Sequence, residues 1–432
     1  MLAYQAPGFR RIVGNISWLM FDRILRMGVG LFVGVWVARY LGPARFGSLS
    51  FALAYVALFG SLTTLGLDGI IVREIVRDSR NTLDILGSTL ALRLTGSFLA
   101  LLFSLLIVRL IEPHDPMALK LVAIVATGLI FQAFDTIDSY FQSQVKSKLT
   151  VLAKNGAFLV IAALRILLIQ RKAPVWPFAV AGVAELALGA IGLAIAYNLV
   201  GGSLLKWHTS WKLSIALLRQ GWPLILSGMA IMIYLRIDTV MLQVMRGDAA
   251  AGLYAAATKV SEVWYFIPTA IVSSVSPAIM RAKTNPLLYY NRLRTLFSAM
   301  ILASLTIGSG VALASGWIVK HLYSGAYSQA APVLAVHIWA SVFVFMGVAQ
   351  SPWDISENLL KLSFYRTAAG AIANIALNLI LIPRYSALGA AIATVVSYAI
   401  SAFLANAFDA RTRPIFRLQL KSFIPSAAVR MS

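Results

Sequence analysis

The chain has 432 residues, of which 59% are hydrophobic and 12% are charged, and its mean hydropathy is +0.81. Soluble domains carry roughly 25% charged residues, so the composition excludes a soluble globular protein and indicates a polytopic helical membrane protein. Cysteine is absent, which excludes disulfides and thiolate metal sites.

Twelve runs of mostly apolar residues are each long enough for a transmembrane helix, which needs about 20 residues. We therefore predict an all-α polytopic membrane protein with about twelve transmembrane helices. No small-residue cleavage site follows the start, so we expect the first run to be retained and not removed as a signal peptide. In chain order the runs are 15–39, 46–67, 85–111, 118–138, 150–169, 175–199, 220–244, 250–279, 295–319, 331–350, 362–382 and 387–408.

The net charge of +21 is distributed unevenly along these predicted spans. If both termini are cytoplasmic, most Lys and Arg residues, Arg73 and Arg366 among them, lie in cytoplasmic segments. This is the positive-inside bias that orients membrane proteins. The basic charge therefore gives no reason to expect nucleic acid as a partner, and it favours contact with anionic membrane lipids.

We predict two six-helix bundles around a central cavity, at 1–200 and 220–410. They are joined by an interfacial linker at 201–219 and followed by a basic cytoplasmic tail at 411–432. The linker carries Trp and Ile on one face and Lys and Arg at headgroup level, as expected of an amphipathic surface helix. The segments "ARYLGPARFGSLSFA" and "VMRGDAAAGLYAAA", which follow the first and seventh spans, are weakly similar. A parallel repeat of this kind is typical of transporters that rock one bundle against another.

The first span carries three charged residues near its start, Asp22, Arg23 and Arg26. They fall within an arc of about 100° on the helix, and Asp22 and Arg26 have the i, i+4 spacing of a salt bridge. Two interpretations are open: a structural ion pair with Arg23 extending to the interface, or a polar face that lines a cavity.

Other predicted spans also contain ionisable residues, which are costly in a membrane and usually face a cavity or a partner. The cationic candidates for binding an anionic substrate are Arg93, Arg165, Arg236 and Lys259, beside Arg23 and Arg26. The candidates for ion coupling or gating are Asp22, Asp68, Arg73, Asp135, Asp138, Glu185, Asp238 and Glu262. Pairing of each acid with a nearby Lys or Arg is the structural alternative, and Asn374 and Asn378 favour helix association. His337 stands alone in its span, so a metal site is not expected.

The block "NISWLMFDRILRMGVGLFVGVWVARYLGPARFGSLSFALAYVALFGSLTTLGLDGIIVREI" (15–75) resembles the start of the Wzx-type polysaccharide flippases. These form part of the multidrug/oligosaccharidyl-lipid/polysaccharide exporter superfamily. "GLYAAATKVSEVWYFIPTAIVSSVSPAI" (252–279) and "NLILIPRYSALGAAIATVVSY" (378–398) are similar to the second half of that family. The order and spacing of these segments extend the resemblance over nearly the whole chain.

The resemblance implies a flippase that moves an undecaprenyl-pyrophosphate-linked oligosaccharide to the periplasmic leaflet, for O-antigen, lipopolysaccharide or exopolysaccharide biosynthesis. It implies alternating access driven by a proton or sodium gradient, no cofactor, and a bacterial inner membrane location with both termini cytoplasmic. A polysaccharide polymerase and chain-length machinery are the implied protein partners. The positions that match the family's pyrophosphate-binding arginines are Arg23, Arg26 and Arg236, whereas Arg93, Arg165 and Lys259 follow from charge alone.

Two alternative functions are weighed against the flippase. A drug or metabolite cation antiporter of the same superfamily would need an acidic cavity, whereas the charge in these spans is mainly basic. A membrane-embedded prenyl-phosphate enzyme would need two D-x-x-D motifs to bind Mg²⁺ and pyrophosphate, and only "DTID" at 135–138 is present. No Walker A, G-x-S-x-G, H-E-x-x-H or dinucleotide-binding motif occurs in the sequence, so we do not expect direct ATP drive. With the flippase favoured over both alternatives, we expect that the protein is not an enzyme.

Overall fold

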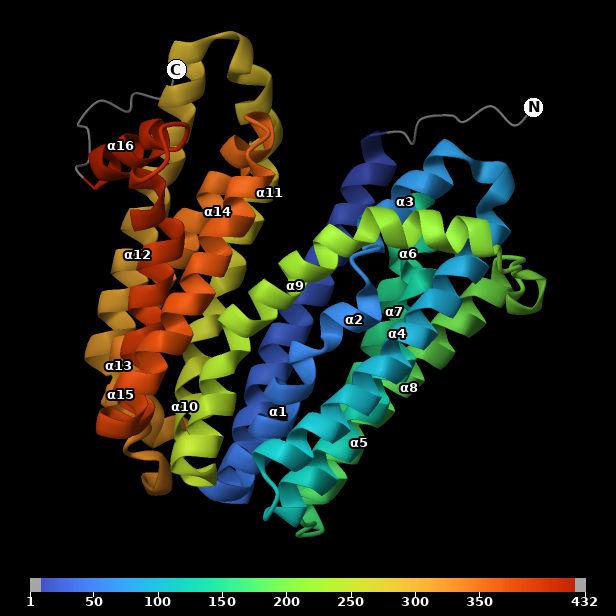
Figure 1. Ribbon diagram of the computed structural model, residues 1–432. Coiled ribbons are helices and arrows are strands. Elements are labelled where there is room, and N and C mark those ends of the chain that lie inside the picture. The colour runs from blue at the N-terminus through green and yellow to red at the C-terminus, as the bar shows by residue number, and fades with distance from the viewer. Residues whose placement is uncertain (1–8, 424–432) are drawn as a thin grey trace. The chain divides into compact units, whose positions relative to one another are not determined.

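The computed structural model describes residues 9–423, with side-chain positions from Trp18 onward apart from Leu19. These residues are mostly helical, and the described part contains no strand (Figure 1). In hydrocarbon each backbone N–H and C=O must find an internal partner, and a helix provides one for every residue of the segment. The predicted basic tail, 411–432, lies partly outside the described residues.

Within the described range, ten helices are long and apolar enough to cross a membrane. The sequence predicts twelve spans, and two of these ten helices each contain one predicted span and most of the next. The first is α1 (Phe9–Leu58), whose backbone is non-helical at Gly42, and the second is α15 (Leu360–Ala402), whose backbone is non-helical at Ser386. Both breaks lie at or next to predicted connections. The ten helices confirm a multi-pass membrane protein, whereas twelve crossings in two bundles stays a prediction.

The chain divides into two compact units. Unit 1 contains the residues up to Leu41 together with Ser48–Met232, and unit 2 contains Gly42–Gly47 together with the residues from Ile233 onward. The helix α9 (Trp211–Arg246) therefore contributes its first part to unit 1 and its second part to unit 2.

Unit 1 is built around long helices that lie side by side, with α5 and α7 both packed on α8 and α4 packed on α5 (Figure 1). Its buried core includes Leu67, Ile71 and Phe141, and Leu217 of α9 joins the same core. The linker predicted at 201–219 is thus packed onto unit 1, and Trp207 in it donates a hydrogen bond to the Tyr197 hydroxyl at 3.0 Å. The other elements of unit 1 are α2 (Gly60–Thr64), α3 (Asp68–Arg77), η1 (Ser79–Asn81), α4 (Thr82–Ile111), α5 (Pro116–Gln132), α6 (Asp135–Ser143), α7 (Ser147–Gln170), α8 (Trp176–Leu199) and η2 (Leu204–Lys206).

In unit 2, α12 packs on α14, and α14 packs on α15, around a core that includes Phe297, Phe345 and Trp353. The helix α12 begins at a proline, and the side chain of Asn285 caps it by accepting a hydrogen bond from Leu288 N at 3.2 Å. The remaining elements are α10 (Asp248–Glu262), η3 (Val263–Tyr265), α11 (Phe266–Arg281), η4 (Ala282–Thr284), α12 (Pro286–Leu322), η5 (Gly325–Tyr327), α13 (Ala330–His337), α14 (Ala340–Ser356), η6 (Leu404–Ala407) and α16 (Arg413–Ser422).

The two segments that the sequence pairs as a repeat have the same backbone conformation at their turns. Gly42 has φ 73° and ψ 170°, and Gly247 has φ 80° and ψ 178°, a region that glycine adopts without steric cost. Five residues after each of them comes a second glycine, Gly47 or Gly252, and these two pack against each other's turn. A Cβ on Gly252 would lie 1.9 Å from the Pro43 carbonyl oxygen. Only glycine fits this contact, which lies inside unit 2.

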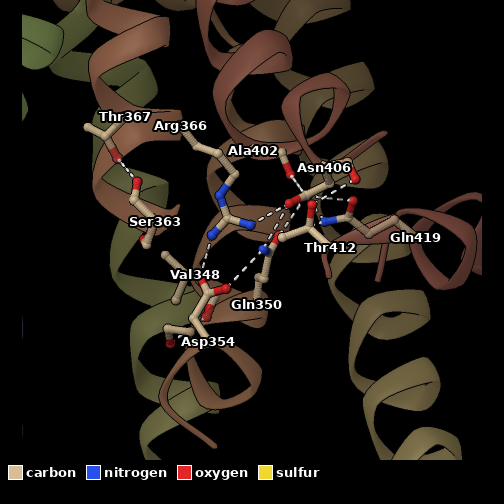
Figure 2. A network of polar contacts seen from close by, with 11 residues as sticks. Val348, Gln350, Asp354, Ser363, Arg366, Thr367, Ala402, Asn406, Thr412 and Gln419 are labelled. Carbon is tan, nitrogen blue, oxygen red and sulfur yellow. Dashed lines mark hydrogen bonds and ion pairs between the residues drawn. The ribbon is translucent and has the colours of Figure 1, made fainter. Parts of the chain in front are cut away.

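A buried polar network holds α16 against the ends of α14 and α15 (Figure 2). The guanidinium of Arg366 binds Asp354 at 2.5 Å and donates to the Asn406 side chain. The amide of Gln419 on α16 donates to Gln350 at 3.1 Å, and Gln350 donates to Asp354 at 3.2 Å. The sequence places Arg366 among the cytoplasmic cations, and its location on that side stays a prediction. Its side chain is buried and paired with a carboxylate.

Candidate functional site

The charged start of α1 forms the ion pair that its spacing predicts. Arg26 Nε donates to Asp22 Oδ1 at 2.8 Å. The same guanidinium lies 3.6 Å from a Glu185 oxygen on α8 and 5.2 Å from the centre of the Phe158 ring on α7. Arg26 therefore ties α1 to two other helices of unit 1. Arg23 is exposed.

Two further ion-pair groups lie in the same unit. Arg165 Nη2 lies 3.1 Å from Glu185 Oε2, so this one carboxylate is shared by two arginines. On the facing helices, Lys154 Nζ lies 2.8 Å from Asp135 and 3.2 Å from Asp138. The two acids of the "DTID" segment therefore share one lysine, and nothing in the described residues groups three metal-ligating side chains.

These groups surround a half-open pocket in unit 1 with a volume of about 200 Å³. The charged side chains of the cluster form complementary pairs. The ion pairs join three cations, Arg26, Lys154 and Arg165, to four carboxylates, Asp22, Asp135, Asp138 and Glu185, and the charged residues that line the pocket itself are two cations and two carboxylates. The pocket is lined by Arg26, Phe131, Gln132, Asp135, Lys154, Glu185, Leu186, Gly189 and Ala190. Arg23 is not one of these lining residues.

Two predicted gating residues of α3 take part in contacts within unit 1. Asp68 forms an ion pair with Arg93, whose side chain is only 1% exposed. Arg73 binds Glu74 at 2.8 Å and the Gln220 side chain on α9 at 2.5 Å. These contacts hold α3 against α4 and against the first part of α9. Arg93 is thus engaged by a carboxylate, and its role in substrate binding stays a prediction.

In unit 2, the predicted cation Arg236 lies 3.5 Å from Glu262, and 43% of its side chain is exposed. The ring of Tyr234 stacks on Tyr398 at 4.2 Å beside this pair. Lys259 lies partly buried on α10. The structure therefore repeats in unit 2 the pairing of a span arginine with a glutamate from a neighbouring helix.

Asp238 is the most deeply enclosed of the predicted acids, with 2% of its surface exposed. Its carboxylate accepts hydrogen bonds from Asn378 at 2.6 Å, Thr394 at 2.9 Å and the Tyr254 hydroxyl at 3.0 Å. Asn378 in turn donates to Asn374 at 3.1 Å, and none of the ion pairs among the described residues involves Asp238. A buried carboxylate with neutral partners is costly when ionised. Binding a proton or a small cation would neutralise it.

The neutral partners of Asp238 are the functional candidates that the sequence interpretation missed. Asn374 and Asn378 were expected to associate helices, and Tyr254 and Thr394 were not singled out. Their only sequence signal is the i, i+4 spacing of the two asparagines in an apolar span. The buried His337, which contacts Ser261 at 2.6 Å, has no companion metal ligands among the described residues.

Known proteins are similar to this chain in sequence and in fold. Residues 12–283 match the polysaccharide biosynthesis protein family. "Probable flippase AglR" of Haloferax volcanii is 30% identical over 193 residues, and the match covers 43% of this chain and 40% of that protein. The chain therefore spans less than half the length of this relative.

Solved structures share the fold at low sequence identity. An inward-facing multidrug resistance MATE family transporter of the MOP superfamily superposes with a TM-score of 0.75 at 15% identity, covering 94% of this chain and 99% of that one. The lipid II flippase MurJ in an inward closed conformation gives 0.69 at 17% identity, covering 95% and 91%. These relatives are transporters and flippases, not enzymes. The family match covers more than half of the chain, and the chain thus belongs to the polysaccharide biosynthesis protein family, with the fold of the MOP-superfamily transporters.

Proposed function

We propose that the protein is a flippase for undecaprenyl-pyrophosphate-linked oligosaccharides, moving them from the cytoplasmic to the periplasmic leaflet by alternating access. The family match over residues 12–283 carries the proposal, because it includes the whole ion-paired pocket of unit 1. The relative named as a probable flippase and the shared fold with a lipid II flippase support it. Surface polysaccharide biosynthesis, including O-antigen and exopolysaccharide, is the proposed context.

The proposed location is the bacterial inner membrane with both termini cytoplasmic, as the distribution of Lys and Arg predicts. A polysaccharide polymerase and chain-length proteins are the proposed partners. In unit 1 the pyrophosphate is assigned to Arg23, which is exposed and lies outside the pocket lining, because guanidinium groups bind phosphate oxygens in a bidentate manner. Arg236 of unit 2, which is 43% exposed and has a single carboxylate at 3.5 Å, is a separate candidate.

Ion coupling is assigned to Asp238. Its carboxylate lies among oxygen and amide groups from α10 and α15, and Asn378 Oδ1 is buried without a partner among the described residues. Oxygen atoms of this kind suit a hard cation such as sodium, and the carboxylate alone suits a proton. Binding of either ion would cancel the buried charge, so the ion gradient could drive a change in the packing of unit 2.

The proposal is tested in proteoliposomes that contain a fluorescent undecaprenyl-pyrophosphate oligosaccharide, with its leaflet position read by quencher access. Wild type is expected to move the lipid, and Arg26→Ala is expected to stop this movement. The control is Arg39→Ala, on the same helix but outside the pocket, which is expected to leave the movement unchanged. Asp238→Asn is expected to remove the dependence on a pH or sodium gradient, and the control is Asp409→Asn, whose carboxylate is partly exposed and paired with Arg411 outside the spans. Transport of the lipid by none of these proteins would overturn the proposal.

One observation favours a second function, a drug or metabolite cation antiporter. The ion-paired cluster of unit 1 contains four carboxylates, which suit an organic cation, and a MATE family transporter shares the fold. Uptake of ethidium into the same proteoliposomes, driven by a pH gradient and abolished by Glu185→Gln, would support the antiporter over the flippase.

A further inference from the structure

We propose that the unit 1 pocket holds a sugar ring of the lipid-linked substrate and that the pyrophosphate binds outside it. This inference rests on the proposed flippase function and adds which part of the substrate meets which residues. Three properties of the pocket carry it: its charge balance, its mixture of donors and acceptors, and its size and apolar wall.

The charge balance disfavours a pyrophosphate in the pocket. Two cations line the pocket, Arg26 and Lys154, and each of them lies within 3.6 Å of two carboxylates. An incoming dianion would have to bind these cations in place of their carboxylates. The carboxylates would then lie next to the dianion without a counter-ion of their own. Like charges at such distances repel strongly in a low-dielectric site. A neutral ligand avoids this cost.

The hydrogen-bonding groups of the pocket are mixed. Asp135 and Glu185 only accept hydrogen bonds, Lys154 and Arg26 only donate them, and the amide of Gln132 does both. Ionised phosphate oxygens only accept, so they have no use for the two carboxylates. A sugar hydroxyl donates one hydrogen bond and accepts others, so it can bind both kinds of group at once. The side chain of Gln132 has no hydrogen-bond partner among the described residues, and 42% of the Asp135 side chain is exposed. Both side chains can therefore bind a ligand.

The size and the wall of the pocket fit one ring. Its volume of about 200 Å³ is below the roughly 300 to 1,000 Å³ of pockets for drug-sized ligands. Phe131, Leu186 and Ala190 provide apolar surface, which suits the C–H face of a pyranose. Gly189 keeps the α8 side of the pocket open, because a Cβ placed there would meet only Lys154 Cγ, at 4.0 Å. A larger side chain at this position would occupy the space of the ligand.

The test compares binding of undecaprenyl pyrophosphate with binding of the same lipid carrying glucose, galactose or N-acetylglucosamine, each to the purified full-length protein. At least one sugar is expected to tighten binding to wild type by about tenfold. Gly189→Leu is expected to abolish this gain while binding of the bare lipid changes less than about twofold. Gly156→Leu, on the exposed face of α7 with no atom near its Cβ position, is the matched control and is expected to keep the gain.

A second variant, Gln132→Ala, removes one polar group without adding bulk, and it is expected to lose part of the gain even if Gly189→Leu folds poorly. If either variant weakens the binding of the bare lipid and of the sugar-bearing lipids equally, the pyrophosphate lies in the pocket and the inference is overturned. A gain that survives both variants would also overturn it. Equal binding of all the lipids to wild type would refute the sugar site and leave the flippase standing, whereas no binding of any lipid would refute the flippase itself.

Discussion

The contact between the two repeat turns makes a sharp prediction for Gly252→Ala. The added Cβ would lie 1.9 Å from the Pro43 oxygen and 3.0 Å from Gly47 N, and real Cβ atoms do not approach closer than 3.0 Å. The turn and α10 would have to separate by roughly 1 Å, and both contacting atoms are backbone that cannot rotate away. Overpacking of this kind costs about 1–3 kcal/mol. The gain of about 0.5–1 kcal/mol from replacing a helical glycine by alanine offsets only part of that cost.

The assay is thermal unfolding of purified protein in detergent, at one scan rate because such proteins often unfold irreversibly. A domain of this size loses about 2–4 °C in Tm for each kcal/mol, so Gly252→Ala is expected to lower the apparent Tm by several degrees. The control is Gly310→Ala on α12, where a Cβ would meet nothing within 4 Å. It is expected to leave the Tm unchanged or slightly raised.

Gly47→Ala probes the same contact from the other side, because its Cβ would lie 1.8 Å from the Asp248 carbonyl oxygen. The Tm of the double variant Gly47→Ala/Gly252→Ala is expected to fall by less than the sum of the two single decreases, since one separation of the helices relieves both clashes. A Tm for Gly252→Ala equal to that of Gly310→Ala would refute the close approach and the reasoning built on it.

Three further predictions follow from other contacts. Arg366→Met leaves the buried Asp354 without its cation and is expected to cost about 3–5 kcal/mol of stability. The cost is measured as a large decrease in Tm and in the amount of folded protein in the membrane, whereas Arg384→Met, at an exposed position, should change neither. Lys154→Met leaves Asp135 and Asp138 without the cation that lies 2.8 and 3.2 Å from them, and is expected to lower the apparent Tm by several degrees; an unchanged Tm would contradict this. Asp115→Ala removes the cap of α5, which accepts hydrogen bonds at 2.8 and 3.0 Å, and is expected to cost about 1 kcal/mol in thermal unfolding.

Much of the helix pattern could be predicted from the sequence, because in a membrane each span must be apolar over its whole length and must satisfy its own backbone. The turn at Gly42 follows from local chemistry as well, since glycine enters the positive φ region freely. The break at Ser386 has no such local signal. The first part of α9 was expected at the membrane surface, and its packing on unit 1 depends on neighbours distant in sequence.

The site was predictable only where its partners are close in sequence. Asp22 and Arg26 are four residues apart, so helical geometry alone pairs them. Asp238 is 140 residues from Asn378, and no spacing rule joins them. The sequence likewise counts more cations than acids in the spans, but the packing of α1, α6, α7 and α8 places two cations and two carboxylates around one pocket.

The sequence by itself determined that this is a helical, multi-pass membrane protein with ionisable residues held in its spans. These properties depend on hydropathy and on spacing along one helix. The tertiary structure decided which carboxylate neutralises which cation, that Arg366 is buried, and that Asp238 lies among neutral groups. Such pairings follow from which helix faces meet, and that is fixed by the packing of many side chains at once.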